Sequence, residues 1–198
     1  MMVHMPTTTS RQSEARDRLL RTAGELFYAD GINSVGVDRV VAEAKVTKAT
    51  FYRHFPSKDD LVVAYLESAD GQFKQWFEQL ASVNADPSEL LRAVFEGLAA
   101  NLYGADFRGC HFINAAAEDS RTDSATRHVV TAHRTWFKAA LRRLLEEAGL
   151  DPADAMASQL VALRDGAMVE GYLDSPEAAG RALLKGFEMT VQNPALLA

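Results

Sequence analysis

Residues 45–61, KVTKATFYRHFPSKDDL, hold three aromatic side chains and four lysine or arginine side chains. Thr47 is a good N-cap, and Pro56 forces the residue before it out of the helical region, so the segment predicts a helix at about 48–54. A helix of about two turns has room for only one or two large apolar anchors. The remaining aromatic and basic side chains are therefore available for a partner.

A helical wheel of about 100° per residue separates these side chains. Phe51 and Phe55 lie close together on it and, with Val46, are predicted to face inward. A second short helix is predicted at about 37–44, and a tight turn at Lys45 and Val46 joins the two. Two short helices joined in this way form a helix-turn-helix candidate at about 37–54.

The side chains left over are those of a protein that binds duplex DNA: Thr47, Lys48, Thr50, Tyr52, Arg53, His54 and Lys58. Lysine and arginine neutralise phosphates or hydrogen-bond guanine edges. The hydroxyls suit phosphates or bases, and tyrosine and histidine can donate to phosphate oxygens. Lys58 falls in the first turn of the next helix, where free backbone N–H groups also favour a phosphate. The alternative interpretation is a helical hairpin with a solvated, charged face.

Apolar residues recur with a period of 3.6 along the rest of the chain, and no alternating strand pattern competes with them. The sequence predicts an all-α fold of about nine helices, at about 11–30, 37–44, 48–54, 57–81, 87–103, 109–118, 123–148, 153–172 and 176–191. Gly31 ends the first helix and Ser57 caps the fourth. The last two helices are apolar on more than one face, which is typical of helices buried on several sides. A subunit interface and an intrachain core both explain that pattern.

Composition excludes several classes of protein. With 198 residues, 47% of them hydrophobic, the chain can form one ordinary domain or two small ones without disulfides. Cys110 is the single cysteine, which fits a reducing compartment. No run approaches the roughly 18 apolar residues of a membrane span, and the N-terminus lacks a signal-peptide core. We therefore expect a cytoplasmic protein with no membrane association, and set residues 1–9 aside from fold reasoning.

The charge is unevenly distributed. The whole chain carries a net charge of −6, which argues against a protein that coats nucleic acid along its whole surface. Residues 1–66 contain nine lysines and arginines against eight acidic residues, and the remainder contains twelve against nineteen. This difference indicates two modules.

The run LLRTAGELFYADGINSVGVDRVVAEAKVTKATFYRHFPSKDDL, at residues 19–61, resembles the N-terminal DNA-binding domain of the tetracycline-repressor-like (TetR) family of bacterial transcriptional regulators. The resemblance extends over about 13–71. It implies a helix-turn-helix DNA-binding domain at 10–56, with three helices, and a helical effector-binding and dimerisation domain at 57–198. It also implies a homodimer that pairs through its last two helices. The run GC-x-F-x-NAAAE, from Gly109 to Glu118, is similar to one found in a subgroup of this family.

The resemblance implies DNA contacts at Thr47, Lys48, Ala49, Thr50, Tyr52, Arg53, His54 and Lys58. Three positions depart from the usual pattern. Val37 replaces a common threonine or serine at the start of the second helix. The next residue is Asp38, whose carboxylate has the same negative sign of charge as a DNA phosphate. Arg39 is the residue we expect to compensate for these two. Ala49 replaces a frequent glycine, which is a mild change.

An effector pocket is expected to be apolar with a few convergent polar groups. The candidates are Phe73, Trp76, Phe77, Phe107, Phe112, Asn114, His133, Trp136, Phe137, Arg164, Met168 and Tyr172. For each aromatic residue, ordinary core packing is the alternative. Arg164 suits either the carboxylate of a ligand or an interface ion pair. His111 and His133 lack neighbours at metal-ligand spacing, so we expect no metal and no cofactor.

The favoured hypothesis is a homodimeric repressor that a small apolar or amphipathic effector releases from a near-palindromic operator. An enzyme is the second hypothesis, but no phosphate-binding loop, nucleophile elbow or metal-ligand cluster supports it, and we expect no catalytic residues. A helical adaptor that binds only protein is the third, and it leaves the basic residues of 48–58 without a role. Salt-dependent DNA retention separates it from the first.

Overall fold

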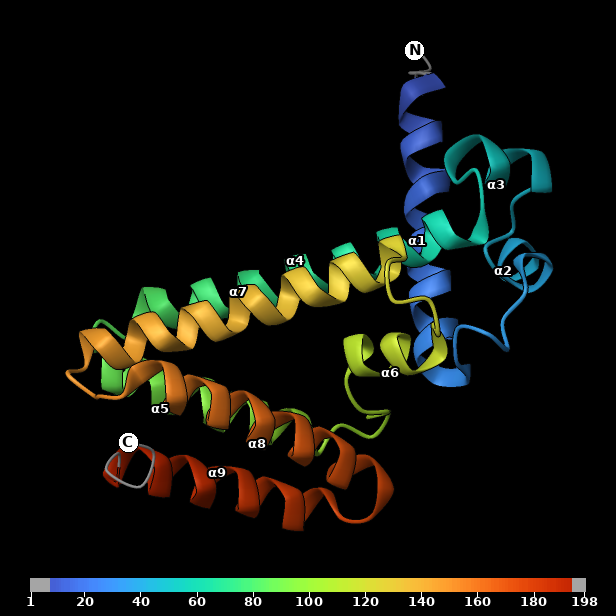
Figure 1. The fold of residues 1–198 in the computed structure, drawn as a ribbon. Helices are drawn as coiled ribbons and strands as arrows, with labels where there is room; N and C mark the ends of the chain where they lie inside the picture. The colour runs from blue at the N-terminus through green and yellow to red at the C-terminus, as the bar shows by residue number, and fades with distance from the viewer. Residues whose placement is uncertain (1–7, 194–198) are drawn as a thin grey trace, which may run out of the picture. The chain divides into compact units, whose positions relative to one another are not determined.

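The structure, a computed structural model, describes residues 8–193. Residues 1–7, set aside above, and residues 194–198, at the end of the predicted second domain, lie outside the described part. Residues 8–193 form nine α-helices and no strand, which confirms the all-α prediction (Figure 1). The helices are α1 Thr8–Asp30, α2 Val37–Glu43, α3 Lys48–His54, α4 Lys58–Val83, α5 Pro87–Asn101, α6 His111–Glu118, α7 Ala125–Glu147, α8 Ala153–Leu173 and α9 Pro176–Gln192.

Local chemistry explains where the helices begin. The hydroxyl oxygen of Ser57 accepts from the Asp60 N–H at 3.1 Å, so Ser57 caps α4 as predicted. The carboxylate of Asp86 caps α5 by accepting from the next two free N–H groups. α6 begins at His111, two residues later than predicted, because Gly109 takes a left-handed conformation (φ +84°) that a right-handed helix does not contain.

The chain divides into two compact units. Unit 1 comprises residues up to 69 together with 115–129, and unit 2 comprises 70–114 together with residues from 130 onwards. Unit 1 therefore contains the predicted 10–56 segment, the start of α4, the end of α6 and the start of α7. The three helices α4, α6 and α7 each contribute residues to both units.

Unit 1 has a small, fully apolar core that joins α1 to α4. Leu19 of α1, Phe51 of α3 and Leu61 of α4 are completely buried. The rings of Phe27 and Tyr65 pack edge to face with their centroids 5.7 Å apart. This core fixes the orientation of α3, since a helix of seven residues has little stability of its own.

Unit 2 is built around α5, α8 and α9, and α8 and α9 lie side by side (Figure 1). The rings of Phe95 on α5 and Phe187 on α9 stack with centroids 4.6 Å apart. Gly186 permits the close approach of α9, because a Cβ atom there would lie 2.6 Å from a methyl carbon of Leu163 on α8. Four large apolar side chains of α8 and α9 nevertheless stay exposed: Val169, Tyr172, Leu173 and Met189.

Candidate DNA-binding site

The turn between α2 and α3 has the geometry of a helix-turn-helix. Lys45 adopts φ +54°, and the N–H groups of Lys45 and Val46 donate to the carbonyls of Ala42 and Val41 at 3.2 and 3.1 Å. Thr47 then caps α3, since its hydroxyl oxygen accepts from the Thr50 N–H at 3.1 Å. The chain therefore reverses over only four residues, 44–47, which places α2 and α3 at a fixed angle.

Two aromatic side chains attach α3 to unit 1, as the helical wheel predicts. Phe51 is fully buried and Phe55 is 3% exposed, with ring centroids 6.0 Å apart. The guanidinium group of Arg16 on α1 lies over the Phe55 ring at 5.3 Å from its centroid. These contacts leave the opposite face of α3 open to solvent.

That open face carries most of the predicted DNA contacts. Its exposed members are Thr47, Lys48, Ala49, Tyr52 and Arg53. Tyr52 is 53% exposed, which is unusual for so large a ring. The hydroxyl oxygens of Thr47 and Thr50 are 2.9 Å apart, and the guanidinium of Arg53 donates to Thr50 at 3.3 Å. These bonds align the polar side chains in one row along α3.

Two of the predicted cations have carboxylate partners in the free protein. The ammonium group of Lys48 lies 2.7 Å from Asp38 on α2, and this pair raises the pKa of Lys48. Arg39 pairs with Glu43 at 2.9 Å and with Asp30 at 2.7 Å. Exposed ion pairs of this kind contribute only about 0–1 kcal/mol, so phosphates can displace the carboxylates at little cost.

Lys58 and His54 lie differently from the other predicted contacts. The Lys58 ammonium donates to the carbonyl of Ile32 at 2.6 Å and lies 6.0 Å from the centre of the Phe27 ring. Nε2 of His54 is buried without a hydrogen-bond partner among the described residues, and burial lowers the pKa of this imidazole. Their roles at DNA stay predictions.

The loop between α1 and α2 is held by a residue from a distant part of the sequence. The carboxylate of Glu118, at the end of α6, accepts from the N–H groups of Ile32 at 3.0 Å and Asn33 at 2.6 Å. The amide of Asn33 donates back to the Glu118 carbonyl at 3.0 Å. Gly31 accommodates this contact with φ +90° and no side chain. Sequence reasoning missed Glu118, because its partners lie 85 and 86 residues away.

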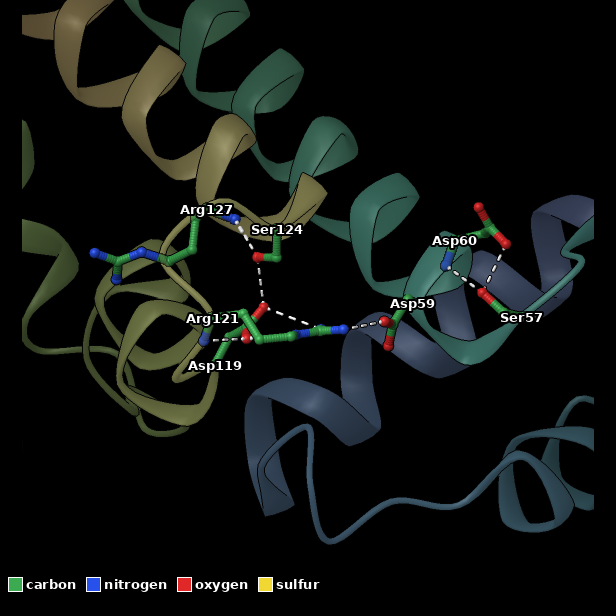
Figure 2. Close-up of polar contacts among 7 residues, drawn as sticks. All are labelled: Ser57, Asp59, Asp60, Asp119, Arg121, Ser124 and Arg127. Atoms are coloured by element: carbon green, nitrogen blue, oxygen red, sulfur yellow. Dashed lines mark hydrogen bonds and ion pairs between the residues drawn. The ribbon is translucent and has the colours of Figure 1, made fainter.

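A second polar network joins the loop after α6 to the start of α4 (Figure 2). Arg121 donates to Asp119 at 3.0 Å and to Asp59, in the first turn of α4, at 2.9 Å. The hydroxyl of Ser124 donates to Asp119 at 2.6 Å and accepts from the Arg127 N–H at 3.1 Å, which caps α7. Arg121 and then Ser124 hold the pKa of Asp119 well below its usual range. The end of α6, the loop at 119–124 and the start of α7 are therefore structural parts of the unit that contains α3.

The structure brings most of the predicted pocket residues together in unit 2. Rings of α4, α6 and α7 form one group in which Phe73 contacts Trp76, His133, Trp136 and Phe137 with centroids 5.1 to 6.1 Å apart. Phe77 contacts Trp136, Phe112 stacks on His133, and Arg164 lies over Phe137.

The other four predicted pocket residues lie at or near the loop before α6. Asn114 donates to the carbonyl of Arg108 at 2.8 Å, and the guanidinium of Arg108 lies 4.9 Å from the centre of the Tyr172 ring. Phe107 lies beside Gly171 of α8, and the carbonyl of Met168 lies beside Gly109. Tyr172 itself is 43% exposed, so its ring is not enclosed in this unit.

A groove of about 400 Å³ lies between α7 and α8. Its lining residues are Arg134, Thr135, Lys138, Ala139, Arg142, Asp154, Ser158 and Val161. None of the twelve predicted pocket residues is among them. Within residues 8–193, no group of three His, Cys, Asp or Glu side chains is arranged to hold a metal ion. None of the helices in this part of the chain is both long enough and apolar enough to span a membrane.

Comparison with known proteins assigns the chain to a family. The family model for bacterial regulatory proteins of the tetR family matches residues 19–65. SCO4454, a TetR-family transcriptional regulator from Streptomyces coelicolor, is 42% identical in sequence, and the alignment covers 92% of this chain and 96% of that one with a TM-score of 0.88.

Two regulators from Bacillus subtilis are more distant relatives. The uncharacterized HTH-type transcriptional regulator YxaF is 25% identical over 166 residues, which cover 82% of this chain and 84% of YxaF. The HTH-type transcriptional regulator LmrA is 24% identical over 161 residues, which cover 80% of this chain and 84% of LmrA. These relatives are transcriptional regulators rather than enzymes. Since a relative 42% identical matches nearly the whole chain, and the family model spans the helices that form the site, this chain belongs to the TetR family of DNA-binding transcriptional regulators.

Proposed function

We propose that this regulator is a homodimeric repressor that leaves a near-palindromic operator when a small molecule binds. The observation that carries the DNA-binding part is the exposed row of hydroxyl, phenol and guanidinium groups on α3, opposite two buried phenylalanines. No such row is needed for folding, because Phe51 and Phe55 already attach the helix to its core. The row is therefore available to contact DNA in the major groove, which is wide enough to admit one helix.

In the proposed complex, the side chains of α3 make different kinds of contact with DNA. Lys48 and Arg53 exchange their present partners for phosphates or guanine edges, and Thr47 and Tyr52 donate hydroxyl hydrogens to phosphate oxygens. Two copies of α3 enter successive major grooves roughly 34–36 Å apart, which sets the spacing of the operator half-sites. Arg39, Ala49, Thr50, His54 and Lys58 complete the predicted set.

The exposed apolar side chains of α8 and α9 support the homodimer. Val169, Tyr172, Leu173 and Met189 are between 43% and 72% exposed, although single helices of a monomer normally turn such residues inward. Pairing α8 and α9 with their copies in a second subunit removes this surface from water. A four-helix interface of this kind also gives the two-fold symmetry that a palindromic operator requires.

Release by an effector requires a connection between the units. α4 supplies residues 58–69 to unit 1 and residues 70–83 to unit 2, so it is the element we propose to transmit the effect. A coupling free energy of about 1–3 kcal/mol, typical of such systems, lowers operator affinity about 5–150-fold.

The experiment begins with selection of bound duplexes from a random DNA pool by the full-length protein. We expect a near-palindromic site and a Kd that rises steeply with salt. Lys48→Ala and Tyr52→Phe are then titrated against that site at matched salt, with Arg143→Ala as the control, since Arg143 is an exposed arginine of α7 in unit 2. Parent-like binding by both α3 variants would show that α3 does not contact DNA. Transcription of a template carrying the site, measured with and without protein, separates repression from activation.

A further inference from the structure

Unit 2 contains a cluster of polar side chains from three helices, two of these side chains buried and two half-buried. Arg164 of α8 is 6% exposed and His133 of α7 is 2% exposed. Asp165 accepts from the guanidinium of Arg164 at 2.9 Å, and Asp70 of α4 lies 2.8 Å from Nδ1 of His133. We call these four residues the buried polar cluster.

Two atoms of the cluster are buried without a hydrogen-bond partner among the described residues: Nε of Arg164 and Nε2 of His133. Buried polar atoms are almost always paired in folded proteins, because burial removes the water that would otherwise satisfy them. The two atoms belong to different helices, so a single local distortion does not explain both. A polar ligand that reaches them would supply the missing hydrogen-bond partners.

The two atoms differ in what they offer. Nε of Arg164 always carries a hydrogen, so it is a donor. Burial acts to raise the pKa of Asp70, but the hydrogen bonds from Lys74 and His133 outweigh it and lower the pKa. Asp70 is therefore ionised and accepts the hydrogen on Nδ1 of His133. Burial lowers the pKa of His133 despite this bond, so the imidazole is neutral and its Nε2 is an acceptor.

The charges around the cluster favour an anion. Asp165 is shared, because Arg134 also donates to it, and Asp70 is paired with Lys74 at 2.6 Å. Three permanent cations thus face two carboxylates, which leaves one positive charge in excess. His111 adds no charge near neutral pH, since burial, and then Arg164 and His133, lower its pKa to about 4.

The surroundings of the cluster are aromatic. The ring of Phe112 stacks on His133 with centroids 3.7 Å apart and only 10° between the planes. Phe73 meets His133 edge to face, and Phe137 lies beneath the guanidinium of Arg164. Phe73 and Trp136 are half-buried rather than buried, so this aromatic group is partly accessible to solvent. A flat apolar ligand suits these rings.

We propose that the buried polar cluster binds the effector through a carboxylate and a hydroxyl group, and that the effector is an aromatic hydroxy acid. One carboxylate oxygen accepts from Nε of Arg164, and the hydroxyl hydrogen is donated to Nε2 of His133. The anion neutralises the excess positive charge, and the ring lies among Phe73, Phe112 and Phe137. This inference rests on the proposed effector response, but the binding itself is testable without DNA.

The test compares four kinds of probe on the full-length protein by isothermal titration calorimetry. The probes are the three hydroxybenzoate isomers, benzoate, which lacks the hydroxyl, the hydroxybenzamides, which lack the charge, and benzamide. We expect at least one hydroxybenzoate to bind at least about tenfold more tightly than its amide, because a charged hydrogen bond is lost in the amide, and several-fold more tightly than benzoate. The comparison within the parent protein needs no variant. If no isomer exceeds its amide and benzoate in affinity, the proposal is wrong.

Variants then assign the two contacts. Arg164→Lys keeps the charge but removes Nε, and should reduce the preference for carboxylate over amide several-fold. His133→Phe keeps a ring against Phe112 but has no hydrogen-bond acceptor, and should abolish the preference for hydroxybenzoate over benzoate. Arg142→Gln, an exposed arginine of α7, is the control and should bind like the parent. Parent-like discrimination by a folded Arg164→Lys protein, checked by circular dichroism, would place the anion elsewhere and overturn the assignment.

Operator release is measured last, so that the proposed ligand site and the proposed repressor function are tested independently of each other. If hydroxybenzoate binds but leaves the operator complex intact, the ligand site stands and the proposed release does not. If no operator is found, the repressor function fails while the calorimetric result is unaffected.

Discussion

Replacing Glu118 by glutamine tests how far α6 supports the DNA-binding unit. Each oxygen of the Glu118 carboxylate accepts from one backbone N–H of the α1–α2 loop, at 3.0 Å from Ile32 and 2.6 Å from Asn33. In Glu118→Gln the amide oxygen keeps one of these bonds. The amide NH₂ group then faces the other N–H, so a donor meets a donor and one charge-assisted bond is lost.

The expected loss of stability follows from the burial of these groups. A hydrogen bond to a charged group is worth about 1.5–3 kcal/mol when its partner is left unpaired. Asn33 is exposed, so water can accept a hydrogen bond from its N–H in place of the carboxylate. Ile32 is half-buried, so water replaces the lost hydrogen bond of its N–H less completely. We therefore expect the free energy of unfolding to fall by about 1–2 kcal/mol in Glu118→Gln, and by about 2–3 kcal/mol in Glu118→Ala.

The assay is urea denaturation followed by circular dichroism, with operator titration on the same samples. Glu146→Gln is the matched control, because Glu146 makes only an exposed i,i+4 pair with Arg142 and should cost about 0–0.5 kcal/mol. Operator affinity should also fall for Glu118→Gln, since the α1–α2 loop leads directly into α2. If Glu118→Gln unfolds at the same urea concentration as Glu146→Gln, Glu118 does not hold the loop and the reasoning is refuted.

Three further predictions concern charge, pH and assembly. Asp38→Asn should tighten DNA binding about 2–5-fold at low salt, because it frees Lys48 and removes an anion near phosphate, and the gain should vanish at high salt. The free energy of unfolding should fall by on the order of 2–3 kcal/mol as the pH is lowered from 6.5 to about 4. Burial lowers the pKa of His111 in the folded protein, so in this pH range the unfolded chain binds a proton that the folded chain does not. His111→Gln should reduce this loss. Leu173→Glu should shift the protein from dimer to monomer in analytical ultracentrifugation without unfolding it, because Leu173 is 72% exposed within one subunit.

Each of these predictions has a matched control. Asp154→Asn removes an equally exposed carboxylate from unit 2 and should leave DNA affinity unchanged. His128→Gln removes an exposed histidine and should keep the parental pH dependence. Val83→Glu places a charge at the exposed end of α4, outside α8 and α9, and should remain dimeric. Equal behaviour of a variant and its control would contradict the corresponding prediction.

The sequence predicts helices well because their determinants are local. Ser57 and Asp86 cap helices through hydrogen bonds to residues two or three positions away, and Pro56 and Gly31 end them through their own backbone preferences. The anchors of α3 are also predictable, because a wheel places Phe51 and Phe55 on one face. The resemblance to the TetR family is carried by the run at residues 19–61, which includes this helix.

The contacts that complete the units are not predictable in this way. Glu118 directly follows a run of three alanines, and its sequence neighbourhood gives no sign of partners near residue 32. The sharing of Asp165 by Arg134 and Arg164 likewise depends on two helices whose relative rotation is set by packing. Several aromatic residues of the predicted pocket contact one another, which both a pocket and ordinary core packing explain, and the polarity beside them depends on which nitrogen of His133 faces Asp70, which sequence does not encode.

The ion pairs on the DNA-binding face also bear on specificity. Lys48 and Arg39 each have a carboxylate neighbour, and the chain as a whole is acidic, with a net charge of −6. Every phosphate contact that we propose for these cations on random DNA would displace such a carboxylate, so non-sequence-specific affinity would be reduced. In the proposed operator complex the same cost is incurred, but the phosphate contacts of Thr47 and Tyr52 fix the register, and contacts of Arg53 with guanine edges depend on sequence. Because specificity is a difference between two affinities, a cost common to both leaves that difference unchanged: the carboxylate partners weaken both complexes, and specificity comes from the contacts that only the operator adds.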